Sequence, residues 1–216
     1  MNLDIFKLLL EGAGITLRVF AATVIFSIPL GLLVAAMRMS KLWILNIPAR
    51  LYILVLRGTP LMLQIMFIFY GPALMKYLNF SWNGNRMLAA TVALILNYAA
   101  YFAEIFRGGI EGIPLGQREA GKVLGLSRTR TFFLIVFPQV VKRVIPPMGN
   151  EIINLVKDTS LIQVIGILEL MNRAKTQASK EVSILPYIVA AGIYLAINAV
   201  LSWLLNFTEK KLDYYR

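Results

Sequence analysis

The feature of this sequence that most limits its fold is a series of five long apolar stretches. They cover residues 13–37, 51–75, 87–106, 144–170 and 184–207. A helix needs about 20 mostly apolar residues to cross the ~30 Å hydrocarbon core of a bilayer. We therefore expect an all-α integral membrane protein with five transmembrane helices. The short connections leave no room for a soluble domain, so we expect residues 1–216 to form a single transmembrane domain.

Composition supports this class, because 58% of the residues are hydrophobic and only 15% are charged. A soluble domain usually carries about 25% charged residues. A sixth apolar run, Phe132 to Val141, has about ten residues and contains Pro138. It is too short to span a bilayer, and we expect it to be a buried or interfacial segment.

The distribution of the basic residues predicts the orientation of the chain. With the N-terminus outside, fourteen Lys and Arg residues fall on the inner side and six on the outer side, which includes the loops 76–86 and 171–183. Cytoplasmic loops carry the excess of Lys and Arg in membrane proteins. We therefore expect an N-out, C-in topology. The net charge of +11 is explained by this bias and by contact with anionic lipid, and no nucleic-acid partner is expected.

A glycine-rich inner segment between the third and fourth spans, about residues 108–138, carries a recognisable motif. From Glu119 to Pro138 it reads EAGKVLGLSRTRTFFLIVFP. It resembles the cytoplasmic EAA loop of ABC importer permeases, which runs Glu-Ala-Ala, three residues, Gly, nine residues, Ile, one residue, Leu-Pro. The spacing is intact, and Gly121 and Phe137 depart from the motif in residue type. The positions assigned to ATPase coupling are Glu119, Ala120, Gly121, Gly125, Ile135 and Pro138.

The resemblance extends over nearly the whole chain. The segments RGTPLMLQ, EIFRGGIEGIPLGQREA and NLVKDTSLIQVIG are similar to the polar amino acid branch of the same family. The resemblance implies a multi-pass permease of a prokaryotic plasma membrane that moves amino acids by alternating access. It also implies a second permease subunit, two cytoplasmic ABC ATPase subunits that bind ATP and magnesium, and an external binding protein that delivers the amino acid.

The expected local structure of this segment is compatible with a coupling role. A short helix between glycine bends can dock into a groove of a soluble partner. Gly125 would permit the backbone turn after such a helix, and Pro138 would fix the angle at which the chain re-enters the membrane. We therefore expect a short cytoplasmic coupling helix between the third and fourth transmembrane helices.

The same segment contains an incomplete phosphate-binding pattern, which we interpret as coincidence. Gly116 is followed by Gly121 and Lys122 at P-loop spacing. Val123 stands where Ser or Thr must hold magnesium, and no strand precedes the segment. The chain is therefore not expected to hydrolyse ATP or to carry a cofactor of its own.

The fourth span carries polar residues at membrane depth: Asn150, Glu151, Asn154, Lys157 and Asp158. At 100° per residue they form one stripe about 120° wide. Three ionised groups facing lipid would cost about 8–10 kcal/mol on insertion scales. The stripe should therefore face the bundle interior or a watery cavity.

Two interpretations of this stripe stay open. Lys157 could pair with Asp158 or with a neighbouring carboxylate and lock helices together. Alternatively, the stripe binds the solute, because a free amino acid needs an acceptor for its ammonium and donors for its carboxylate. Glu151 and Asn154 suit these roles, and Asn97 and Gln64 are candidate wall residues. The candidate solute-binding residues are Glu151, Asn154, Asn97, Gln64, Asp158 and Lys157.

Two other functional classes agree less well with the sequence. An ion-coupled secondary transporter or channel could use the stripe as a proton relay, but no inverted repeat is detectable. An intramembrane enzyme would need a nucleophile with a base or a metal ion. The chain has no His and no Cys, and no metal site is expected. An internal carboxylate favours a cationic or zwitterionic solute such as arginine, with glutamine and histidine as rivals. The sequence leaves open the exact amino acid, the choice between homodimer and heterodimer, and whether this subunit itself holds the solute.

Overall fold

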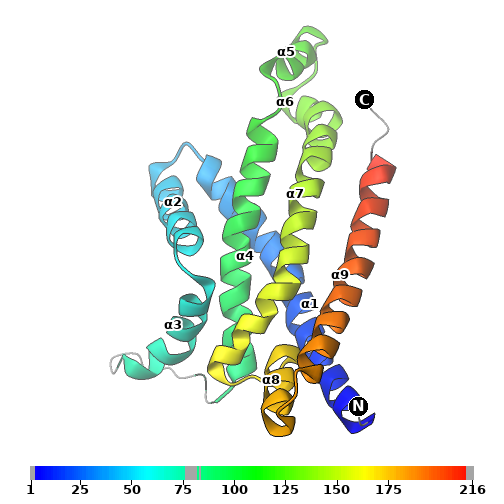
Figure 1. Ribbon diagram of the computed structural model, residues 1–216. Helices are drawn as coiled ribbons and strands as arrows, with labels where there is room; N and C mark the ends of the chain where they lie inside the picture. Colours follow the sequence, from blue (N-terminus) through cyan, green and yellow to red (C-terminus); the bar gives the residue numbers. More distant parts are fainter. Residues whose placement is uncertain (1–2, 76–81, 83, 213–216) are drawn as a thin grey trace.

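A computed structural model describes residues 3–75, 82 and 84–212, and Figure 1 shows the arrangement of their helices. Lys76 and Arg216, which count toward the charge bias, lie outside the described residues. The elements are α1 (Leu3–Met39), α2 (Trp43–Gly58), α3 (Leu61–Leu74), α4 (Arg86–Glu111), α5 (Leu115–Val123), α6 (Arg128–Thr131), the π-helix η1 (Phe132–Val136), α7 (Phe137–Asp158), the 3-10 helix η2 (Thr159–Ile165), α8 (Leu170–Glu181) and α9 (Leu185–Leu212).

The expected fold class is confirmed. Four helical segments, residues 4–39, 86–111, 128–165 and 185–211, are long and apolar enough to cross a membrane. The bent pair α2–α3 provides the fifth span if the two helices are counted together. α1 begins and α9 ends at opposite ends of the bundle, which agrees with an odd number of crossings (Figure 1).

The second span differs from the continuous helix expected over residues 51–75. Helical structure already begins at Trp43, and the chain then bends by 111° between α2 and α3. Pro60, which has no N–H to donate, stands immediately before α3 as its N-cap residue. The helix before it was missed because Arg50 and Arg57 lower the hydropathy of that segment.

Two buried amide side chains satisfy the backbone groups that this break releases. Gln64 Nε2 lies 2.9 Å from the Leu56 carbonyl oxygen and 3.0 Å from that of Thr59. Asn97 on α4 donates to the same Leu56 oxygen at 3.0 Å and to Gln64 Oε1 at 2.9 Å. Broken helices persist in membranes only where neighbouring groups satisfy the freed backbone in this way.

The fourth span is longer than the stretch 144–170 expected from the sequence. Helical structure runs from Arg128 through η1 and α7 into η2, so the run Phe132–Val141 belongs to the span. Pro138 is therefore not a point of re-entry but lies in the first turn of α7. The π-helical turn before it accommodates the missing N–H, a local adjustment that transmembrane helices tolerate.

The polar stretch expected as the loop 171–183 is mostly the helix α8. Glu169 caps this helix, because its carboxylate oxygens accept hydrogen bonds from the backbone N–H groups of Met171 and Asn172, both at 2.7 Å. The side chain is fully buried and also accepts from the Tyr194 hydroxyl of α9. Burial raises the pKa of Glu169 above its usual value, and these hydrogen bonds partly oppose the shift.

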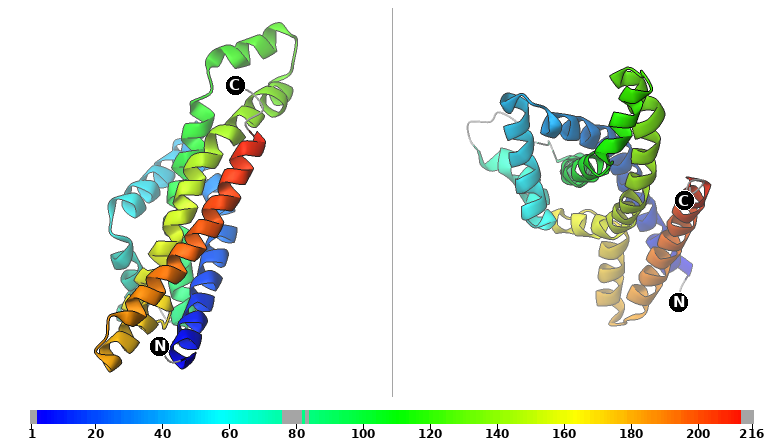
Figure 2. Two further views of the ribbon diagram at one scale, coloured as in Figure 1. Left: turned by 45° about the vertical axis from the view of Figure 1, so that its right-hand side comes forward. Right: turned by 90° about the horizontal axis from the view of Figure 1, so that it is seen from above.

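α4 is the central helix of the bundle. Viewed along the bundle it lies among α1, α2–α3 and α7 (Figure 2), and it packs against all of them. Small residues permit close contact: a Cβ added to Gly31 of α1 would lie 2.8 Å from Phe102 Cβ and 3.0 Å from the Ala99 carbonyl oxygen. Such small-residue contacts are typical of helix pairs in membranes.

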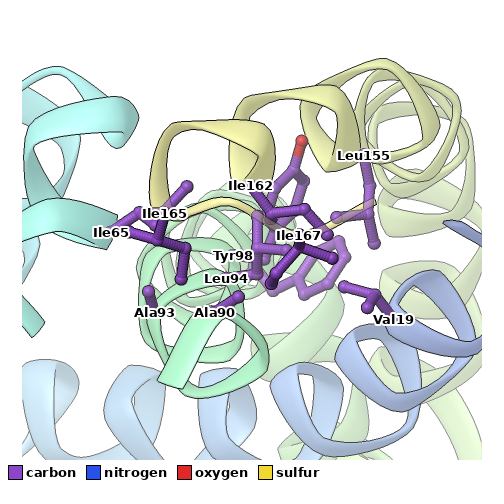
Figure 3. Close-up of a cluster of buried hydrophobic side chains, with 11 residues drawn as sticks. Val19, Ile65, Ala90, Ala93, Leu94, Tyr98, Leu155, Ile162, Ile165 and Ile167 are labelled. Carbon is purple, nitrogen blue, oxygen red and sulfur yellow. The ribbon is translucent and has the colours of Figure 1, made fainter. Parts of the chain in front are cut away.

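The largest apolar cluster lies where α1, α3, α4, α7 and η2 meet (Figure 3). Ile65, Leu94 and Leu155 are fully buried there. Tyr98 is also part of the cluster, and its hydroxyl points out of it (Figure 3). The same cluster therefore holds in place one polar group at the edge of the site described below.

Removal of the amide at position 64 should destabilise the break. Gln64→Leu leaves the carbonyls of Leu56 and Thr59 with fewer donors, and each unsatisfied buried group costs about 1–3 kcal/mol. We expect a clearly lower thermal midpoint for the detergent-purified protein. Gln163→Leu is the matched control, because no hydrogen bond of the Gln163 side chain is found within the described part of the chain. Equal midpoints for the two variants would contradict this account.

The buried Glu169 predicts a pH dependence of stability. Because its folded-state pKa is raised, its contribution is greatest below the unfolded pKa and is lost as pH rises through the folded pKa. Unfolding of the wild type followed across this range should show that loss, and Glu169→Gln should reduce the slope. Glu181→Gln at the exposed end of α8 should leave the slope unchanged. Identical slopes for Glu169→Gln and wild type would contradict the assignment.

Candidate functional site

A polar cavity of about 440 Å³ lies between the α2–α3 break, α4 and the end of α7. This volume falls within the range of about 300–1,000 Å³ typical of small-molecule sites. The lining residues are Thr59, Leu61, Asn97, Tyr98, Tyr101, Glu151, Asn154, Lys157 and Asp158. Three separate spans thus contribute to one compartment.

The wall formed by α7 carries the charges of the cavity. Glu151, Asn154 and Asp158 recur three and four residues apart, so they share one face of the helix. Asp158 is the last residue of α7, and its Oδ2 accepts a hydrogen bond of 2.7 Å from the Tyr98 hydroxyl. The negative end of a helix dipole favours cations. This wall therefore suits a positively charged group.

The opposite wall is the beginning of α3. Thr59 and Leu61 line the cavity on either side of Pro60, and no side chain caps this helix end. The first N–H groups of a helix lack partners within the helix, and the dipole places partial positive charge there. In discontinuous transmembrane helices such ends face the anionic groups of substrates. The cavity thus lies between an acidic wall and an electropositive one.

The structure brings five of the six predicted solute-binding residues to this cavity. They are Glu151, Asn154, Asn97, Asp158 and Lys157. Gln64 is not part of the lining, because its amide holds the α2–α3 break together. Asn97 does both, since it lines the cavity and its amide nitrogen is engaged at the break.

The alternative pairing of Lys157 with Asp158 does not form. Among the residues that the structure describes, no ion pair within 4.0 Å joins them, and Asp158 is held by Tyr98 instead. Adjacent residues project about 100° apart on a helix, which separates their side chains. Lys157 thus adds a positive charge to a cavity that also contains two carboxylates.

The cavity lining also includes Tyr98, Tyr101 and Thr59, which are not among the residues proposed from the sequence. The ring of Tyr98 does pack, but its hydroxyl orients Asp158. The sequence does contain a signal for this role of Tyr98, because a tyrosine buried in an apolar helix generally needs a partner for its hydroxyl. The position of Thr59 depends on the break and could not be read from spacing.

An arginine cluster lies beside the cavity, toward the end of α4 that leads to α5. Glu104 pairs with Arg107, three residues later on the same helix, at 2.7 Å. Arg38 Nε and Arg57 Nη1 lie 3.9 Å from the same carboxylate. The Arg57 guanidinium also stands 5.1 Å from the ring centre of Tyr101. Arg57 thus connects the cluster to the cavity wall.

The predicted coupling segment contains the expected short helix, α5, which projects beyond the end of the bundle (Figure 1). Glu119 and Ala120 are exposed on it. The expected turn follows at Gly125, which has φ +70°. Leu126 N–H donates to the Gly121 carbonyl at 2.9 Å and closes the helix end. Ile135 lies in η1, so the segment joins the fourth span without an interruption.

Gly121, where the motif has alanine, contacts the neighbouring helix directly. A Cβ at this position would lie 2.5 Å from Thr131 Cγ2 and 2.6 Å from its hydroxyl oxygen. The departure from the motif is therefore matched by a threonine on α6. The P-loop-like spacing has no phosphate-binding geometry, because Gly116, Gly121 and Lys122 all lie within the α5 helix.

These features define a class: a helical membrane protein with a solute-sized polar cavity and a short helix that projects beyond one end of the bundle. The profile of one family, described as binding-protein-dependent transport system inner membrane component, matches residues 27–214. The chain belongs to this family.

Characterised relatives agree over nearly the full length. The octopine transport system permease protein OccM of Rhizobium radiobacter is 39% identical over 94% of this chain and 85% of its own length. The glutamine transport system permease protein GlnP of Escherichia coli K12 is 37% identical over 95% and 93%. The arginine transport system permease protein ArtQ of Bacillus subtilis is 35% identical over 98% of both chains.

A solved structure has the same fold. An amino acid ABC transporter crystallised with histidines is 32% identical, covers 98% of this chain and 100% of the other, and superposes with a TM-score of 0.85. The MetNI methionine transporter, at 14% identity and a TM-score of 0.75, shares the fold.

The contact between Gly121 and Thr131 predicts an unusual outcome for a change toward the motif. Gly121→Ala should weaken the packing of α5 on α6 by about 1–3 kcal/mol, because the added methyl group overlaps Thr131. We expect faster proteolysis of the segment in the purified protein. Gly116→Ala is the control on the same helix, since a Cβ there meets nothing within 4 Å. Equal proteolysis rates would contradict the contact.

Proposed function

We propose that this chain is the permease subunit of an ATP-driven importer of polar, basic amino acids in the plasma membrane of a prokaryote. Family membership supports the transport class, and relatives named for octopine, glutamine and arginine transport support amino acids as the solutes. The subunit itself performs no covalent chemistry. It exposes the solute alternately to the two sides of the membrane.

One observation carries the assignment of the solute class. The cavity faces the uncapped N-terminus of α3 on one side and the carboxylates Glu151 and Asp158 on the other. A zwitterionic amino acid presents a carboxylate and an ammonium at opposite ends of the same small molecule. The carboxylate would meet the α3 N–H groups, and the ammonium would meet the acidic wall.

The charge of the lining favours a basic side chain. Two carboxylates and one ammonium, that of Lys157, leave the cavity with one excess negative charge. A zwitterion does not neutralise this charge, whereas a solute with an additional guanidinium or ammonium does. Arginine is therefore the solute that we propose first.

The energy for transport is proposed to come from separate subunits. α5 projects from the bundle, sits on the side predicted to be cytoplasmic and is connected through a turn, α6 and η1 to α7, which carries Glu151 and Asp158. Docking of an ABC ATPase dimer on the exposed Glu119 and Ala120, with Gly121 seating the helix on α6, would transmit its motion along this segment to the cavity. Magnesium and ATP would be bound by those partners. A second permease subunit and an external amino acid-binding protein complete the proposed assembly.

The test is uptake by the complete importer in proteoliposomes. We expect arginine uptake to require ATP on the inner side, and Glu151→Gln to weaken the apparent affinity for arginine about ten- to hundredfold, the value of a charged hydrogen bond. The loss should be smaller for glutamine. Glu181→Gln, on the exposed end of α8, is the charge-matched control.

Two results would overturn the proposal. One is uptake driven by an ion gradient without nucleotide, which would indicate a secondary transporter. The other is an unchanged affinity for arginine in Glu151→Gln at a thermal midpoint equal to that of the wild type.

A further inference from the structure

A second hollow, separate from the solute cavity, lies between the end of α1, α2 and α4. It encloses about 620 Å³ and shares no lining residue with the solute cavity. Three arginines and one glutamate contribute its charges: Arg38, Arg50, Arg57 and Glu104. Aliphatic side chains form the rest of the lining, with Ile47, Leu51 and Leu54 prominent among them. We refer to it as the arginine groove.

The sequence of α2 places both kinds of side chain on one face. Ile47, Leu51 and Leu54 follow helical spacing, and Arg50 lies between them. The three aliphatic side chains are 55%, 58% and 70% exposed, although each is large. Arg57 continues the face seven residues after Arg50. A face that alternates guanidinium and aliphatic groups is typical of helices at a charged membrane surface.

The positive charge of the groove is not balanced from within. Glu104 is engaged by Arg107 at 2.7 Å, whereas Arg38 and Arg57 lie only within 3.9 Å of it. Arg50 is exposed, and no hydrogen bond or ion pair reaches its side chain from the residues that the structure describes. The groove therefore keeps two excess positive charges, and the guanidinium N–H groups of Arg50 have no partner among the described residues.

The position of the groove limits what can occupy it. It opens where α1 ends and α2 begins, in the half of the molecule that carries α5 (Figure 1) and that the charge bias predicts to be cytoplasmic. The inner leaflet of a membrane presents anionic lipid at this depth. A soluble anion would use the guanidinium groups and leave the exposed aliphatic side chains in water. A phospholipid uses both.

We propose that the arginine groove binds one anionic phospholipid of the inner leaflet, with its phosphodiester between Arg38 and Arg50 and its acyl chains along Leu51 and Leu54. Guanidinium groups bind phosphate oxygens in a bidentate manner, which gives the headgroup a fixed place. The bound lipid fills the space between α2 and α4 and so supports the helix that leads into the break.

The experiment is native mass spectrometry of the complete importer titrated with phosphatidylglycerol, with phosphatidylcholine as the neutral lipid. We expect one tightly retained phosphatidylglycerol for each copy of this chain. Arg38→Gln/Arg50→Gln should weaken its binding about fivefold for each arginine removed. Arg57 stays unchanged because it contacts Tyr101 of the solute cavity.

Matched variants separate this site from general attraction to the membrane surface. Lys210→Gln/Lys211→Gln removes two charges from the inner end of α9 and should leave the retained lipid in place. Leu54→Trp keeps every charge but fills the aliphatic part of the groove, and it should displace the lipid. Inorganic phosphate at millimolar concentration should not compete.

Four outcomes would overturn the proposal. These are equal retention of phosphatidylcholine, equal loss in the lysine variant, displacement by inorganic phosphate, and a groove buried by the second permease subunit with no lipid retained. The last is recognised by protection of Arg50 from arginine-specific labelling in the complex. None of these outcomes depends on which amino acid the importer carries.

Discussion

The break between α2 and α3 is the constraint on which the rest of the structure depends. An interrupted helix in an apolar environment releases carbonyl groups that water cannot reach, and Gln64 and Asn97 satisfy them from within the protein. The same interruption turns the start of α3 toward the cavity. The break thus has two consequences. It leaves backbone carbonyl groups that two side-chain amides must satisfy, and it forms the electropositive wall of the site.

Much of the fold could be predicted because hydrophobicity in long runs has only one physical solution in a bilayer. The limits of the prediction lie at the prolines. Pro60 marks a break with a helix on each side, whereas Pro138 lies inside a continuous helix after a π-helical turn. The local sequence around each proline does not distinguish these outcomes. The partners that settle the first, Gln64 and Asn97, are 33 residues apart in the chain.

Some residues of the site could likewise be predicted from the sequence, and others could not. The stripe on α7 was predictable, since charged groups in a bilayer must face inward and helical spacing fixes which residues share a face. The contributions of Thr59 and Tyr98 were not, because they arise from how other spans meet that stripe. The coupling segment shows the opposite case, in which spacing gave the position of a helix and a turn. The reason for glycine at 121 became clear only from the contact with Thr131.

The close packing of α1 on α4 at Gly31 has a mechanical consequence. Backbone and Cβ atoms meet there with no space for one more methyl group, so the two helices are packed as one rigid unit. α2 and α3 form a bent pair of helices beside this unit, and the bend lies at Gly58–Pro60. The bend therefore lies next to Thr59 and Leu61, two residues of the cavity lining, so any change of the angle between α2 and α3 would change the shape of the cavity.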